Sequence, residues 1–220
     1  MKTSATALVL GALAASIAHA DDFGGGGDGY RNQHAVFVMT NDADANEVIA
    51  YERSSYGTLD NPHRYSTGGR GSGGTVDPLA SQGSLTLSED GAALFAVNAG
   101  SGTVSLFRVL GSRLALTDRV TTGGSEPNAV AQHGKLVYVL NTAGSASVVG
   151  FRWDNGRLDR IEGSLRFLSG NFVDSASLAF SGDGRYLAVT ERTTNNIDVF
   201  RVLANGKLSP IKVNASAGAG

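Results

Sequence analysis

A four-fold internal repeat is the feature that most constrains the fold of this chain of 220 residues. Each copy has an apolar strand, a polar turn, an alternating strand that ends in an aromatic residue, and a glycine turn that leads to a leucine. The leucines are 44 to 55 residues apart, which is close to the period of propeller blades. The aromatic anchors are Tyr51, Phe107, Phe151 and Phe200, and the leucine anchors are Leu59, Leu114, Leu158 and Leu208.

A fourth short strand precedes three of the four copies. Residues 84–91, 128–134 and 177–184 each read as a strand that closes in a turn rich in Gly or Asp. Four strands joined by hairpins make a propeller blade. The first copy starts at Val36 without such a strand. We therefore predict an all-β fold: a partial, open-arc β-propeller of about four blades, with four-stranded antiparallel blades and an incomplete first blade.

The segments around the repeats predict an exported protein. Residues 1–20 combine a basic start, an apolar centre and a small-x-small cleavage signal, which is typical of a signal peptide. Residues 21–33 contain a glycine run and are predicted to form a flexible leader. The repeats then occupy 34–213, and 214–220 form a tail. The predicted location is secreted or periplasmic.

Composition restricts the partners. A net charge of -2 provides no basic field for nucleic acid or an anionic membrane, and no later segment is as long and apolar as a membrane helix. Without cysteine, stability must come from strand pairing and apolar burial. An open arc leaves two blade faces uncovered, which predicts self-association, or a chain that is a truncated member or a fragment of a larger ring.

Two of the copies resemble a known family. The stretches "LSEDGAALFAVNAGSGTVSLFRV" (87–109) and "FSGDGRYLAVTERTTNNIDVFRV" (180–202) are similar to repeats of the β-propeller lactonase-like family. This family includes 6-phosphogluconolactonases and carboxymuconate cyclases and overlaps with YVTN-type surface repeats. The resemblance covers 35 to about 213 and implies a ring that is usually seven-bladed, of which this sequence encodes three full blades and one three-stranded blade. It indicates the fold more specifically than the activity, because propellers host unrelated functions.

The resemblance implies a reaction that opens or closes a lactone. Such chemistry requires a group that transfers protons and cations that hold a carboxylate. Glu191 and Arg192 stand where two other copies have Asn98 and Asn141, so we predict Glu191 as the acid/base and Arg192 as an anion holder. The alternative is a solvated hairpin end whose local ion pair contributes little.

Further substrate contacts are predicted from other loops. Arg70 lies in the glycine-rich run 68–74, whose backbone amides are predicted to form an anion nest, with a flexible insertion as the alternative. The substrate set is completed by Asn98, Asn128 and Asn141. The family resemblance implies a His directly after a Pro at the entry to an inner strand, but here Asn128 follows Pro127.

Two histidines and one acidic loop are further candidates for functional residues. His34 and His133 lie near predicted turns, where histidines are generally solvated. Asp42, Asp44 and Asn46 alternate oxygen ligands as in the first half of a calcium loop, although its glycine and distal Glu are missing. Ca²⁺ is the one cofactor that this pattern suggests, and a polar hairpin turn is the alternative.

The functional hypothesis is therefore an exported lactonase-like propeller that hydrolyses or isomerises a small lactone or carboxylate. Its alternative is a non-catalytic propeller for ligand binding or surface protein interaction, which the Asn at position 128 and the incomplete ring favour. The chain contains no Gly-x-Ser-x-Gly elbow and no His-Glu-x-x-His motif of other hydrolases.

Overall fold

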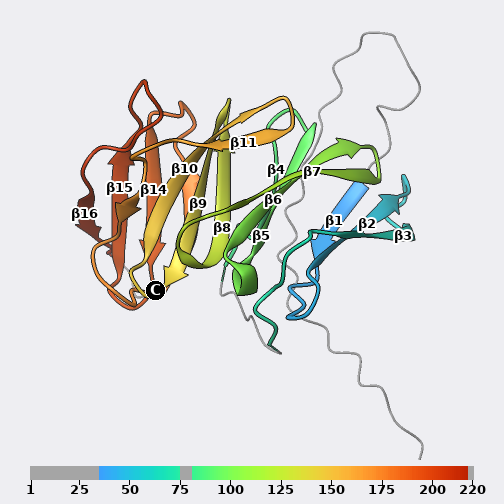
Figure 1. Ribbon diagram of the computed structural model, residues 1–220, viewed down its shortest axis with the longest axis horizontal. Helices are drawn as coiled ribbons and strands as arrows, with labels where there is room; N and C mark the ends of the chain where they lie inside the picture. Colours follow the sequence, from blue (N-terminus) through green and yellow to red (C-terminus); the bar gives the residue numbers. More distant parts are fainter. Residues whose placement is uncertain (1–34, 75–80, 218–220) are drawn as a thin grey trace, which may run out of the picture.

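A computed structural model describes residues 35–74 and 81–217 (Figure 1). Four antiparallel sheets follow one another in chain order, from the blue strands at the right of the picture to the red strands at the left. Each sheet corresponds to one copy of the repeat. This confirms the prediction of an all-β, partial propeller of about four blades, and no α-helix occurs in the part of the chain that the structure describes.

The strands of the four blades have the following bounds. Blade 1 has β1 (Ala35–Met39), β2 (Glu47–Arg53) and β3 (Leu59–Ser66). Blade 2 has β4 (Leu85–Leu87), β5 (Ala93–Asn98), β6 (Thr103–Leu110) and β7 (Arg113–Thr121), with a 3-10 turn at Ala99–Ser101. Blade 3 has β8 (Ser125–His133), β9 (Leu136–Ala143), β10 (Ser147–Asp154), β11 (Arg157–Arg160) and the short β12 (Arg166–Phe167). Blade 4 has β13 (Ser175–Phe180), β14 (Tyr186–Glu191), β15 (Asn196–Arg201) and β16 (Lys212–Ala215).

Several predicted segments lie outside the described residues. These are the signal peptide at 1–20, the leader at 21–33, His34 and the last part of the tail. The last strand, β16, continues to Ala215 and so runs past the predicted end of the repeats at 213. Among the residues described, no helix is long and apolar enough to cross a membrane.

The apolar cores lie between consecutive blades. The strand β5 shows how this arises, because its side chains alternate between two cores. Phe95 and Val97 pack against blade 3, while Leu94 and Ala96 pack toward blade 1. All six residues of β5 are buried, as expected for a strand covered on both faces.

The repeat anchors of blades 2, 3 and 4 are buried, whereas those of blade 1 are not: Tyr51 is half-buried and Leu59 is exposed. Phe107, Phe151 and Phe200 are fully buried on the third strand of their blades. Replacing such a phenylalanine by alanine would cost about 3–5 kcal/mol. Leu59 differs from the other three leucines because it is 45% exposed. It begins β3, the outermost strand of blade 1, which is exposed along nearly all of its length.

The segments between blades repeat as well. Residues 67–74, 122–124 and 168–174 leave the outermost strand of one blade in the direction of the next, and we call them the crossovers. Each crossover begins with the same backbone hydrogen bond or its equivalent, from the N–H groups of Thr67, Thr122 and Leu168 to the carbonyls of Asn46, Gly102 and Ala146. This shared bond places Ser169 at the position of Gly68 and Gly123.

Candidate functional site

Three of the predicted site residues occupy one repeated position. Asn98, Asn141 and Glu191 lie toward the end of the second strand of blades 2, 3 and 4, and each pairs with the first residue of the following strand. We call this the junction position, because the preceding crossover packs on it. A Cβ atom at Gly69 or Gly124 would lie under 3.0 Å from the Asn at this position, so glycine permits the close approach.

In blade 2 the junction position is filled by a fully hydrogen-bonded amide. The Nδ2 of Asn98 donates to the hydroxyls of Thr103 (3.0 Å) and Ser105 (2.8 Å). Its Oδ1 accepts a hydrogen bond from the Nδ2 of Asn46 in blade 1 (2.9 Å). Asn98 is completely buried. Its side chain therefore ties blade 1 to blade 2, and its polar atoms are engaged within the protein.

In blade 3 the junction position also carries an amide, but without the equivalent partners. Asn141 is completely buried, and neither its Nδ2 nor its Oδ1 has a hydrogen-bond partner in the described part of the chain. Val149 stands where blade 2 has Ser105, and Gly102 stands where blade 1 has Asn46. A buried polar group without a partner costs about 1–3 kcal/mol.

In blade 4 the junction position carries a carboxylate. Glu191 is 3% exposed, so it is not the solvated hairpin end that the sequence offered as an alternative. The backbone N–H of Ser169 donates to its Oε1 (3.1 Å), and the Ser169 hydroxyl donates to its Oε2 (2.6 Å). The hydroxyl of Thr194 also donates to Oε2 (2.5 Å).

A second carboxyl group lies beside Glu191. Asp198 is completely buried two residues into the neighbouring β15, and its Oδ2 also accepts from the Ser169 N–H (3.1 Å). Burial, together with the hydrogen bond and the negative charge of Glu191, raises the pKa of Asp198 to about 7. Burial opposes ionisation of Glu191, but hydrogen bonds from Ser169, Thr194 and Asp198 lower the pKa of Glu191 below its ordinary value. At pH values below about 7 the pair therefore holds one proton, on Asp198.

This carboxyl pair is specific to blade 4. Asp198 stands at the position of Ser105 in blade 2 and Val149 in blade 3. Ser169 stands where the two other crossovers have glycine. Glu191, Asp198 and Ser169 are thus all different from the residues at the equivalent positions of blades 2 and 3. Sequence reasoning identified Glu191 but missed Asp198, Ser169 and Thr194, although aligning the copies at these positions would have found the first two.

Arg192 forms an ion pair with Asp174, at the end of the crossover. Its Nε and Nη2 donate to the two oxygens of Asp174 (3.0 and 2.8 Å), and both side chains are partly exposed. Glu191 and Arg192 are therefore neighbours in sequence whose side chains have separate partners.

The remaining predicted substrate residues lie in other blades. The backbone N–H of Arg70 donates to the Ser101 hydroxyl (3.0 Å), between blades 1 and 2. The Nδ2 of Asn128 donates to the carbonyl of Ser175 (2.7 Å), between blades 3 and 4. Arg70 and Glu191 therefore lie at different blade junctions. The predicted set is thus distributed over successive blade junctions.

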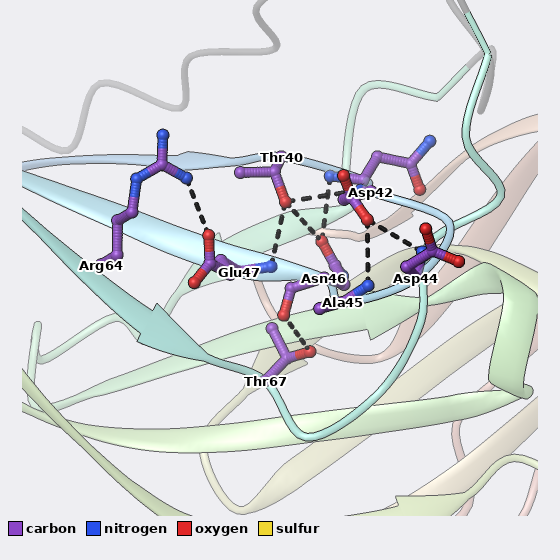
Figure 2. A network of polar contacts seen from close by, with 9 residues as sticks. Thr40, Asp42, Asp44, Ala45, Asn46, Glu47, Arg64 and Thr67 are labelled. Atoms are coloured by element: carbon purple, nitrogen blue, oxygen red, sulfur yellow. Dashed lines mark hydrogen bonds and ion pairs between the residues drawn. The ribbon is translucent and has the colours of Figure 1, made fainter.

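The predicted calcium loop is a hydrogen-bonded turn (Figure 2). The Oδ1 of Asp42 accepts from the N–H groups of Asp44 (2.8 Å) and Ala45 (2.9 Å), and these backbone bonds lower the pKa of Asp42. The Oδ1 of Asn46 instead accepts from the hydroxyl of Thr40 (3.3 Å), so it does not converge with the two acids. Within the described residues, no group of three His, Cys, Asp or Glu side chains is placed to hold a metal ion.

Comparison with known proteins identifies the repeat. The family model for the lactonase, 7-bladed β-propeller, matches residues 31–175. Solved structures with this architecture include a candidate 6-phosphogluconolactonase from Bacteroides fragilis, with a TM-score of 0.64 and 18% identity over 84% of this chain and 55% of that one. Another is a periplasmic gluconolactonase from Pseudomonas aeruginosa, with a TM-score of 0.62 and 23% identity over 84% of this chain and 55% of that one.

These similarities show the fold, but they cover only part of the related proteins. The chain spans about 55% of the length of these solved proteins. No curated protein matches its sequence. Glu191 and Asp198 lie beyond the residues matched by the family model, so a role for the carboxyl pair has to be argued from its own geometry.

Proposed function

The chain belongs to the seven-bladed lactonase β-propeller family, and from this premise we propose that it hydrolyses a small lactone with Glu191 and Asp198 as its proton-transfer pair. The observation that carries this proposal is the carboxyl pair itself. A carboxylic acid with a pKa of about 7 beside a carboxylate is suited to acid and base catalysis near neutral pH.

The proposed reaction uses both carboxyl groups. As water attacks the lactone carbonyl, the Glu191 carboxylate accepts one of its protons. The tetrahedral intermediate then breaks the bond between the acyl carbon and the ring oxygen, and Asp198 donates its proton to that oxygen. The product is a hydroxy acid, and proton exchange with solvent returns the pair to its starting state. General acid–base catalysis of this kind contributes about 10²–10⁴-fold in rate.

Substrate reaches the pair only when the crossover at 168–174 moves. In the closed arrangement Ser169 covers both carboxyl groups through its hydrogen bonds. The same crossover holds Phe172 at a φ of 56°, a left-handed conformation that bulky residues rarely adopt. Asp174, which ends the crossover, binds Arg192. Movement of the crossover would free this arginine to hold the carboxylate of a ring-opened product, as predicted from the sequence.

A sugar lactone without phosphate is the substrate we propose to test. Phosphorylated sugar lactones are mainly cytoplasmic, whereas residues 1–20 predict export to the periplasm or beyond. The Pseudomonas aeruginosa structure is that of a periplasmic gluconolactonase, which supports D-glucono-1,5-lactone as the first probe.

The test compares hydrolysis by the wild type, Glu191→Gln and Asp198→Asn in a pH-stat, after subtraction of spontaneous hydrolysis. Both substitutions preserve shape and remove a proton-transfer group, so kcat should fall about 10²–10⁴-fold. Glu162→Gln is the matched control, because Glu162 is exposed, and it should keep full activity. A wild-type rate equal to that of buffer, or an unchanged rate in Glu191→Gln, would refute the proposal.

A second candidate function is a non-catalytic binding propeller. It is favoured because the contacts of Glu191 with Ser169, Thr194 and Asp198 all lie within the protein. In that case the carboxyl pair fastens the crossover between blades 3 and 4. Glu191→Gln would then alter the melting temperature while leaving ligand or partner binding intact.

A further inference from the structure

An open pocket of about 340 Å³ lies along the innermost strands of blades 2, 3 and 4. The innermost strands of a propeller face its axis, so we call this the axial pocket. The carboxyl pair is not among the lining residues that the structure describes. The polar side chains that line the pocket include Gln82, Thr86, Glu89, Gln132, His133 and Ser177, and Ser181 lies at its edge in the turn of blade 4.

Blade 3 has a shortened turn beside the axial pocket. The turn between β8 and β9 is shorter than the corresponding turns of blades 2 and 4. In those blades Ser88 and Ser181 close their own turns by donating to Asp90 and Asp183 (both 2.6 Å). His133 occupies the equivalent position in blade 3. Its side chain is therefore available for contacts outside its own turn.

Contacts from the two neighbouring blades hold the imidazole in place. The Nδ1 of His133 lies 2.7 Å from the Oε1 of Glu89 in blade 2, and the Oε2 of Glu89 accepts from the N–H of Gly134 (3.1 Å). On the other side the ring packs on Phe180 of blade 4, with 5.5 Å between ring centroids. A Cβ atom at Gly184 would collide with the His133 ring, so this glycine is required for the arrangement.

The side chains of His133 and Glu89 remain accessible to a ligand. The side chain of His133 is 35% exposed and that of Glu89 is 55% exposed. When the proton lies on Nδ1, between His133 and Glu89, the Nε2 atom is a hydrogen-bond acceptor. Gln82 also lines the pocket and is exposed, and Ser177 adds a partly buried hydroxyl.

The chemistry of the lining defines the class of ligand. Amide, hydroxyl, imidazole and carboxylate groups together can donate to and accept from the hydroxyl groups of a ligand. The ring of Phe180 provides an apolar surface for its carbon atoms. The described lining residues include a carboxylate but no Lys or Arg, so an anionic ligand would meet repulsion without a compensating cation. We propose that the axial pocket binds a neutral polyhydroxylated molecule, such as a sugar or sugar alcohol.

A matched pair of probes tests this proposal. D-glucitol and D-gluconate have the same carbon chain, and the second carries a carboxylate. Saturation-transfer NMR with the full chain at pH 7.5 should detect D-glucitol and give at least a five-fold weaker affinity for D-gluconate. Glu89→Gln removes the repelling charge and should bring the two affinities within two-fold of each other.

Two further variants locate the binding. Gln82→Ala removes an exposed lining side chain without disturbing the core and should weaken D-glucitol binding by at least three-fold. Thr193→Val is the control, because Thr193 is exposed beside Glu191 and does not line the axial pocket, and it should bind as the wild type does. Glu191→Gln should also leave binding unchanged, which separates this site from the proposed catalytic pair. No D-glucitol signal, equal affinities for both probes in the wild type, or wild-type binding by Gln82→Ala would overturn the proposal.

Discussion

Blades 2 and 4 use the same position of the repeat for different chemistry. In blade 2 the junction position holds Asn98, a neutral amide whose donors and acceptor are matched by Thr103, Ser105 and Asn46. In blade 4 it holds Glu191 beside Asp198, two acids that share one proton. Both arrangements fasten a crossover, but only the second contains titratable groups. The repeat thus keeps the backbone position of the junction residue, while the side chain at that position differs between blades.

The largest expected effect concerns pH. The pKa of Asp198 is raised from 3.8 to about 7 in the folded protein, so the folded state binds the proton more tightly than the unfolded state. Stability should therefore fall as the pH rises from about 4 through 7, by up to about 4 kcal/mol at about 1.4 kcal/mol per pKa unit. The lowered pKa of Glu191 acts in the opposite sense, and its contribution is lost as the pH falls below its ordinary value of 4.5.

Thermal melting between pH 5 and 8 measures this difference. The wild type should lose on the order of 10 °C in Tm over that interval. Asp198→Asn keeps the shape without the titration, so its profile should be flatter and its Tm should exceed that of the wild type at pH 8. Parallel profiles for the two proteins would show that Asp198 is not the group responsible.

The glycines of the crossovers provide the next test. Gly69→Ala would place a Cβ atom under 3.0 Å from Asn98, which should destabilise the fold by about 3 kcal/mol. Gly170→Ala, at the equivalent position before blade 4, would meet Val173 at an ordinary 3.5 Å and should change stability by less than about 1 kcal/mol. Urea unfolding of both variants measures the contrast, and equal losses would contradict the packing described for the junction position.

The two asparagines should respond oppositely to one substitution. Asn98→Leu would leave the hydrogen-bonding groups of Asn46 and Ser105 unmatched and should cost about 2 kcal/mol. Asn141→Leu would remove a buried amide that has no partner in the described residues, and it should be neutral or stabilising by about 1 kcal/mol. Chemical denaturation measures both free energies of unfolding. A loss of similar size for Asn141→Leu would indicate that its amide is satisfied.

The smallest effect is expected for the charged pair on the surface. Arg192 and Asp174 are 41% and 47% exposed, so solvent screens their attraction. Arg192→Gln should therefore lower the free energy of unfolding by at most about 1 kcal/mol. Adding salt should reduce the difference between variant and wild type. A larger loss would mean that this ion pair, rather than the carboxyl pair, fastens the last crossover.

The site was predictable from sequence to a limited extent. Comparing the copies singled out Glu191, because it replaces an asparagine in a repeat that provides its own reference. Its partners were missed because they belong to another crossover and another strand, which are brought together by strand pairing and blade stacking. The predicted anion holders Arg70 and Arg192 are far apart in the chain, and they contact different blade junctions.

What the sequence determined by itself is the architecture. Apolar alternation, glycine turns and a recurring order of motifs specify four consecutive antiparallel sheets, because these signals act over a few residues and repeat at the period of a blade. The tertiary structure alone decided which polar groups meet. It left Asn141 without the partners of Asn98, placed Glu191 and Asp198 on the same N–H of Ser169, and brought His133 to Glu89. The reason is physical: the partners of a buried polar group and its pKa depend on contacts between blades, and these contacts join residues that are distant in sequence.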